Sequence, residues 1–367
     1  MARSRRAAAL GVFLVLGVVT AAAPAAAGAR HHPILRVTVS ANESTGSPET
    51  DSNGGTPWLS GDFAGFSAVA DKDFGVWRGR PITSASDFQT NASWRAFDST
   101  ERVIKDWRGQ NQGIVLSIAV PLWAGYGDHL AAASGGYFNQ HFQTMARNLV
   151  AAGLGNSVLR IGWEFNGDWF RWGITATSKP QLYDERAREF ASAWRQIVTA
   201  IRHVKGEHFK FDWCLSAGPH YRNLNLAYPG NAYVDYIGMD VYDWNREGMP
   251  DTTQARWNAI VNQGTGLAWL AKFAAAHDRE ISVPEWALVH DSVQRKHSGG
   301  DDKSFVSHMH QWFASHDVGY ENYFNFTDGW MSFRMNDSSG QFPGAGKLYR
   351  SLWARVGGVQ HERHQRR

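Results

Sequence analysis

The 367-residue sequence predicts an α/β fold and, within that class, a (β/α)8 TIM barrel formed by a single domain. Short apolar runs typical of strands alternate with segments whose apolar residues recur at helical spacing. About eight such units fit into roughly 300 residues, as expected for successive parallel βαβ units. The alternative is an open doubly wound sheet. That fold more often carries a Gly-rich first turn with phosphate-binding spacing, which this sequence lacks.

The predicted strands are short apolar runs bounded by turn residues. The first, near Trp58–Asp62, is weak, and the other seven are clear. In order, these seven are Pro81–Phe88, Gly113–Leu122, Val158–Phe165, Phe209–Ser216, Val234–Tyr242, Ile281–Leu288 and Tyr320–Phe326.

The predicted helices lie between these strands, where apolar residues recur every three to four positions. A short one covers Gly65–Trp77. The longer ones are Ser93–Trp107, Tyr137–Ala152, Gln181–Val204, Thr253–Ala276, Lys303–Ala314 and Gly346–Val356.

The two ends of the chain differ in character from the barrel. Three early arginines, an apolar run from Ala7 to Thr20 and small residues before Arg30 predict an export signal over residues 1–29, through the general or the twin-arginine route. We therefore expect a secreted, extracellular protein. Residues 30–54 form a predicted flexible lead-in, 55–358 the barrel domain and 359–367 a disordered tail.

The composition excludes several classes of protein. Hydrophobic residues make up 43% of the chain, enough for a large core. The first 58 residues carry five Arg against three acidic residues, and the tail from Val359 three Arg against one Glu, so the positive excess lies at the ends and predicts no nucleic-acid binding. No second apolar run is long enough to span a membrane. The single cysteine, Cys214, is expected to be a buried, inert thiol.

No metal site is expected, because HExxH, paired-cysteine and EF-hand patterns are all missing from the sequence. No cofactor is expected either, because two carboxyl groups are enough for the chemistry considered below. We also expect a monomer.

Two glutamates are the candidate catalytic residues. In a TIM barrel, functional side chains project from the carboxyl ends of the strands, and Glu164 and Glu285 stand at two such ends, inside apolar runs and beside tryptophans. A carboxylate there is costly unless it is paired or used in catalysis. Strands four and seven can face each other across the barrel mouth. Two carboxyl groups ~5–5.5 Å apart are what a retaining glycosidase needs. The alternative is an ion-pair role at the barrel rim.

Further candidates stand at or after the ends of other strands. Flat aromatic rings at a cleft suit sugars, which present apolar C–H faces with hydroxyl groups at the rim. The substrate-binding candidates on this ground are Trp123, His220 and Trp286.

One motif resembles a known family. The stretch LRIGWEFNGDWFRWG at residues 159–173 is similar to the acid/base signature of glycoside hydrolase family 26, the β-mannanase family: an Arg, a Glu followed by x-Asn-Gly-x-Trp, and a second Trp before Gly. The run ISVPEWAL at 281–288 looks like the nucleophile strand of that family. Asp240–Asp243 looks like the segment whose Tyr holds the nucleophile. The resemblance covers about residues 55–356 and implies a TIM-barrel hydrolase that retains anomeric configuration.

The resemblance implies roles for individual residues. Glu164 would be the acid/base and Glu285 the nucleophile, with Tyr242 hydrogen-bonded to Glu285. The remaining residues would orient Glu164 or bind the sugar near the bond that is cleaved; they are Arg160, Trp163, Asn166, Trp169 and Trp172.

The expected substrate is β-mannan or a related polysaccharide. The family's mannanases usually carry His just before the acid/base, where this chain has Trp163. One alternative therefore keeps the enzyme class and changes the polymer to β-glucan, β-1,3-xylan, or a cell-wall or exopolysaccharide. The other alternative is a carbohydrate-binding barrel without catalysis, although such proteins usually lose one carboxylate and both are present here.

Overall fold

The structure, a computed structural model, describes residues 58–218, 223–244, 250–291, 298–329, 331–338 and 340–354. The expected export signal (1–29), lead-in (30–54) and tail (359–367) lie outside these ranges, so they stay predictions.

Eight parallel strands close into a barrel in the order β1-β2-β3-β4-β5-β6-β7-β9, which confirms the predicted fold class. All eight expected strands are present, including the weak first one. Their bounds are β1 Leu59–Phe63, β2 Ser84–Phe88, β3 Val115–Val120, β4 Val158–Ile161, β5 Lys210–Ser216, β6 Tyr236–Tyr242, β7 Glu280–Ala287 and β9 Val318–Phe324.

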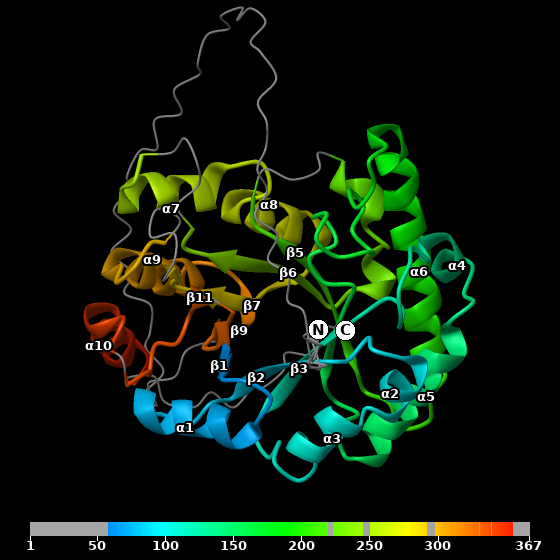
Figure 1. Ribbon diagram of the computed structural model, residues 1–367, viewed down its shortest axis with the longest axis horizontal. Helices are drawn as coiled ribbons and strands as arrows, with labels where there is room; N and C mark the ends of the chain where they lie inside the picture. Colours follow the sequence, from blue (N-terminus) through cyan, green and yellow to red (C-terminus); the bar gives the residue numbers. More distant parts are fainter. Residues whose placement is uncertain are drawn as a thin grey trace, which may run out of the picture.

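Helices surround the strands as an outer ring (Figure 1). Their bounds are α1 Ala68–Arg78, α2 Trp94–Ser99, α3 Glu101–Trp107, α4 Leu130–Ser134, α5 Asn139–Ala151, α6 Tyr183–Arg202, α7 Thr253–Asn262, α8 Leu267–His277, α9 Lys303–Ala314 and α10 Pro343–Trp353. Short 3₁₀ turns cover Pro180–Leu182, Leu224–Ala227 and Asn231–Tyr233.

Two expected helices are each divided in two. Thr100 adopts a left-handed φ of +47°, which separates α2 from α3. Residues 263–266 separate α7 from α8. Gly266 packs so closely in this connection that a Cβ there would lie 2.6 Å from the backbone oxygens of Ile260 and Val261, so only glycine fits. Helical spacing of apolar residues continues through both breaks, so periodicity alone did not reveal them.

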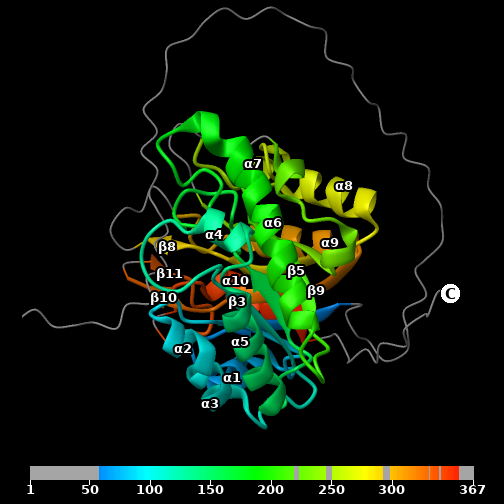
Figure 2. The same cartoon turned by 90° about the vertical axis from the view of Figure 1, so that its right-hand side faces the viewer.

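A small antiparallel sheet of β10, β11 and β8 covers part of the carboxyl end of the barrel (Figure 2). β8 (His290–Asp291) follows β7, while β10 (Thr327–Asp328) and β11 (Met331–Ser332) follow β9. Phe333, directly after β11, packs against Tyr242 at the end of β6, with ring centroids 5.4 Å apart. The sheet therefore adds a wall beside the strand ends, where a TIM barrel carries its site.

A buried polar cluster lies in the half of the barrel interior that is farther from the carboxyl ends of the strands. Asp212, near the start of β5, accepts hydrogen bonds from Ser282 (2.8 Å) and from the hydroxyl of Tyr320. Complete burial raises the pKa of Asp212 to about 6, although the charge of Arg160 opposes the shift. A carboxyl group with a raised pKa in the folded state predicts that the barrel's stability decreases as the pH rises through 6.

Candidate active site

A sharp turn at the end of β4 presents Glu164. The strand ends at Ile161, earlier than expected, because Gly162 and Glu164 both adopt left-handed φ values, +55° and +51°. A Cβ at position 162 would lie 2.9 Å from Phe190, so glycine is required there. A glutamate in this region costs about 1 kcal/mol. The backbone N–H of Glu164 still donates to Cys214 on β5 at 3.0 Å, which holds the strained turn in place.

Glu164 is 4% exposed, and its carboxyl group takes hydrogen bonds from the side chains of Trp169 and Ser216. The indole Nε1 of Trp169 donates to its Oε2 at 2.7 Å. Burial raises the pKa of Glu164 to about 7, the charge of Glu285 adds to the rise, and the Trp169 hydrogen bond opposes it. A carboxyl group with this pKa is available as an acid and as a base near neutral pH.

Glu285 extends from β7 into the barrel mouth and meets two donors. The hydroxyl of Tyr242 donates to Oε2 at 2.6 Å, which confirms the expected hydrogen bond. The guanidinium Nη1 of Arg160 donates to Oε1 at 2.8 Å. Burial and the charge of Glu285 raise the pKa of Tyr242 well above its ordinary value, so its hydroxyl keeps the proton that it donates. Together the two contacts engage both carboxylate oxygens and hold the Glu285 side chain in one orientation.

The hydrogen bonds of the Arg160 guanidinium go to Glu285 and Asp240, while its charge acts on Glu164 without a direct bond between them. Arg160 is fully buried beneath the mouth, where it joins Glu285 to Asp240 on β6 through contacts of 2.9 and 2.6 Å to the two Asp240 oxygens. β-strand alternation had indicated that Arg160 points inward. It did not indicate which carboxylate the long side chain meets.

Asp240 is a site residue that the sequence patterns did not single out. It stands two positions before Tyr242 on β6, so strand alternation puts both on one face, and that signal was available. Burial raises the pKa of Asp240 well above its ordinary value, while the charge of Arg160 opposes the rise. The Cys214 thiol donates to Asp240 at 3.3 Å. Burial raises the pKa of this thiol, which is consistent with the expected inert cysteine.

Three predicted substrate-binding residues are structural in this arrangement. Asn166 is fully buried, and its amide bonds the backbone of Ser216 in both directions at 2.8 Å, which ties the loop after β4 to β5. Trp286 is fully buried on the outer face of β7, where its indole donates to Glu321 at 2.6 Å. Trp123 is 1% exposed and donates to the carbonyl of Gly127 at 3.2 Å. None of the three has ring or amide surface free for a sugar.

Trp163 and Trp172 form a packed aromatic wall behind Glu164. Trp163 is 5% exposed, with its ring 4.9 Å from Trp172 and 4.7 Å from Phe170. Trp172 is 3% exposed, stacks on Phe170 at 4.6 Å and donates to the carbonyl of Trp163 at 2.9 Å. Both were expected to contact substrate. Their burial assigns them mainly to the support of the strained turn.

Trp169 is the half-buried tryptophan of this loop. A Cβ on Gly167 would lie 2.3 Å from its ring, so the glycine backbone packs directly against the indole. The indole edge meets Glu164, as described above. This placement keeps Trp169 next to Glu164, the candidate acid/base, and leaves it a candidate sugar contact.

His220 lies outside the described residues, so its predicted role stays a prediction. Among the described residues, no group of three or more His, Cys, Asp or Glu side chains could hold a metal ion. No helix in that same part of the chain is long and apolar enough to cross a membrane.

The comparisons with known proteins agree with this geometry. The model of glycosyl hydrolase family 26 matches residues 138–285, a segment that contains both glutamates. A mannan endo-1,4-beta-mannosidase of Bifidobacterium adolescentis is 26% identical over 49% of this chain and 18% of its own length. One from Bacillus subtilis is 32% identical over 22% of this chain and 21% of its own length. Endoglucanase H of Acetivibrio thermocellus is 26% identical over 60% of this chain and 23% of its own length. The chain thus spans about a fifth of the length of these curated relatives.

Solved structures share the barrel at low sequence identity. A Bacillus subtilis mannanase has a TM-score of 0.54 and 17% identity, over 82% of this chain and 86% of that one. The catalytic domain of an endo-beta-1,4-mannanase from a Bacillus species has a TM-score of 0.57 and 16% identity, over 82% and 87%. At these identities the likeness concerns the fold. The family match, the curated relatives and the barrel agree that the chain is similar to glycosyl hydrolase family 26, with the family model covering residues 138–285.

Proposed function

We propose that this protein is a secreted, retaining endo-β-glycosidase that hydrolyses β-mannan or a related polysaccharide by double displacement. The observation that carries the proposal is the contrast between two buried carboxyl groups. Burial raises the pKa of Glu164 to about 7, whereas Glu285 accepts charge-stabilising hydrogen bonds from Tyr242 and Arg160. Two carboxyl groups in opposed environments are what separate acid and nucleophile roles require.

In the first step, Glu164 donates its proton to the glycosidic oxygen while a Glu285 oxygen attacks the anomeric carbon. The C–O bond to the leaving sugar breaks, and a covalent glycosyl ester forms on Glu285. In the second step, Glu164 accepts a proton from water, and the water oxygen displaces Glu285 from the anomeric carbon. The product is released, and the two carboxyl groups return to their starting states.

The charge coupling between the glutamates supports this exchange of roles. The negative charge of Glu285 is one cause of the raised pKa of Glu164. Formation of the ester removes that charge, so the pKa of Glu164 falls when the residue must act as a base. Arg160 and Tyr242 then stabilise the carboxylate that leaves in the second step.

The substrate assignment is supported by the mannan-degrading relatives. A β-glucan is the second candidate, because Endoglucanase H aligns with the largest share of this chain among the three curated relatives compared above. Trp163, in place of the usual His, is consistent with a substrate other than mannan.

Reducing-sugar release from mannan, glucomannan, xylan, β-glucan and arabinan tests the function. We expect release from mannan or glucomannan by the wild type, and none by Glu285→Ala. Release from β-glucan or xylan alone would move the assignment to that polymer. Tight binding of polysaccharide with no release by the folded wild type would show a non-catalytic binding barrel.

A further inference from the structure

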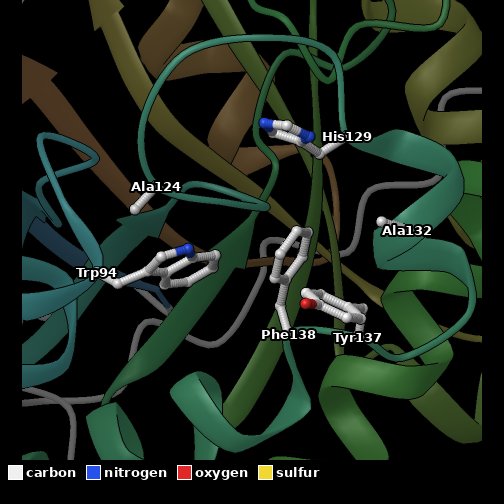
Figure 3. Close-up of a pocket in the computed structure, with 6 residues that line it drawn as sticks. All are labelled: Trp94, Ala124, His129, Ala132, Tyr137 and Phe138. Carbon is white, nitrogen blue, oxygen red and sulfur yellow. The ribbon is translucent and has the colours of Figure 1, made fainter.

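A pocket of about 240 Å³ opens on the flank of the barrel, between the start of α2 and the segment that leads from β3 into α5. Figure 3 shows the four rings and two alanines that surround it; they are Trp94, Ala124, His129, Ala132, Tyr137 and Phe138. Neither Glu164 nor Glu285 lines it. The pocket is therefore distinct from the proposed catalytic site.

Trp123 separates the pocket from the loop that carries Glu164. Its indole meets Trp172 of that loop edge-on at 6.4 Å on one side and His129 of the pocket at 5.9 Å on the other. Because Trp123 is buried and fixed to Gly127, it forms a closed wall. A polymer that reached both places would have to pass over the barrel rim.

The apolar side of the pocket is preorganised. Trp94 stacks on His141 with ring centroids 3.9 Å apart and 14° between the planes, and His141 bonds Asp98 at 2.8 Å. Phe138 packs at 4.8 Å from Trp94. Rings held in this way lose little side-chain entropy when they stack against a ligand.

The polar side offers a fixed acceptor and an exposed hydroxyl. Nε2 of His129 lies 2.8 Å from the carbonyl of Tyr126. A carbonyl only accepts, so Nε2 carries the proton, and in the neutral ring Nδ1 is an acceptor. Tyr137 is 81% exposed, and its hydroxyl can both donate and accept. None of the lining residues is a carboxylate, Lys or Arg, so the pocket suits an uncharged ligand.

We propose that this pocket binds one neutral hexose unit of a polysaccharide, as a second carbohydrate site outside the catalytic cleft. Aromatic faces for the sugar's C–H surface, together with a donor and an acceptor for its hydroxyl groups, are the chemistry that recognises a neutral pyranose. The volume lies below the ~300–1,000 Å³ of pockets for drug-sized ligands, which limits the occupant to about one ring. The identity of the polymer rests on the proposed function.

Native gels containing soluble glucomannan or galactomannan test the site through retardation of the protein. The parent for this comparison is Glu285→Ala, which prevents cleavage of the gel polymer. Adding Tyr137→Ala should weaken apparent binding about tenfold, and Ala132→Phe, which fills the pocket, should do the same. Tyr126→Ala is the matched control, because Tyr126 is 87% exposed on the neighbouring loop and does not line the pocket. Equal retardation of all four proteins would overturn the proposal.

Kinetics in the presence of both glutamates separate this pocket from the cleft. Tyr137→Ala should lower kcat/KM several-fold on the polymer and leave it unchanged on a short oligosaccharide. Equal losses on both substrates would place Tyr137 in the cleft and contradict a second site. If the wild type hydrolyses no polymer, the proposed function fails. The retardation of the Glu285→Ala proteins, repeated across neutral polysaccharides, still decides whether the pocket binds sugar.

Discussion

Replacement of Trp169 by Phe should move the alkaline limb of the pH profile upward. The indole Nε1 donates to Glu164 at 2.7 Å and is one of the forces that lower the pKa of a carboxyl group otherwise raised by burial and by Glu285. A hydrogen bond to a charged group contributes about 1.5–3 kcal/mol. Trp169 is only half-buried, so the lower end applies, and 1.36 kcal/mol corresponds to one pH unit. The alkaline limb should therefore rise by about one pH unit.

The assay is kcat/KM on the polymer between about pH 4 and 10, because this ratio reports the essential acid of the free enzyme. Phe keeps an aromatic ring at position 169. If the substitution only weakens a sugar contact, kcat/KM falls at every pH and the alkaline limb stays in place. Trp172→Phe is the control, since its indole donates to the carbonyl of Trp163 and not to a carboxylate. An alkaline limb that stays fixed or moves down in Trp169→Phe would refute the reasoning.

Three other predictions concern the nucleophile, the barrel interior and the chain terminus. Tyr242→Phe should fold normally and lose activity roughly 100-fold, since Glu285 loses the hydrogen bond that orients its carboxylate; an unchanged rate would remove Tyr242 from the site. Because burial raises the pKa of Asp212 to about 6, the protonated carboxyl group contributes fully to the free energy of unfolding below about pH 4. This contribution is lost as the pH rises through 6. The free energy of unfolding of Asp212→Asn, relative to that of the wild type, should therefore increase by about 2–3 kcal/mol between pH 4 and 8. Denaturant unfolding measures both proteins, and a difference that stays constant with pH would contradict the assignment. Intact mass of the exported protein should show loss of residues 1 to about 29, and a chain that still begins at Met1 or Ala2 would refute the predicted signal.

Strand positions were predictable because each barrel strand is a short apolar run between turn residues. The end of β4 was not, because the apolar pattern continues through Gly162, Trp163 and Phe165 after the backbone has turned. That turn depends on two left-handed residues. Glycine signals such a conformation at position 162, but nothing in the sequence marks Glu164 as strained.

The two candidate catalytic glutamates were easier to identify in the sequence than the residues that surround them. Burial of a glutamate in an apolar strand costs free energy unless the carboxylate is paired or used, so the sequence identified Glu164 and Glu285 as candidates. Trp286 was assigned to the substrate because it adjoins Glu285, yet neighbouring strand residues point to opposite faces, so an inward Glu285 requires an outward Trp286. Asn166, Trp123 and Trp172 sit in loops or beyond strand ends, where no periodicity shows which side chains face the cleft.

The partner of Arg160 depends on three-dimensional packing. The sequence predicted the strand that carries Arg160 and the face on which its side chain lies. It did not predict the partner, because three carboxyl groups, those of Glu164, Glu285 and Asp240, lie near the barrel mouth. The structure resolves the choice in favour of Glu285 and Asp240. This pairing gives Arg160 a role in positioning Glu285, the proposed nucleophile, instead of in sugar binding.

The separate roles of the two glutamates are the central claim, and azide rescue tests them most directly. Glu164→Ala should still form the glycosyl ester from an activated aryl glycoside of the right sugar and then stall, since no base activates water. Added azide should restore its turnover and give a glycosyl azide of retained configuration. Glu285→Ala should be nearly inactive without azide and give the inverted azide with it. The opposite stereochemistry in the two variants would mean that the roles are exchanged, and full activity in both folded variants would show that this is not the catalytic pair.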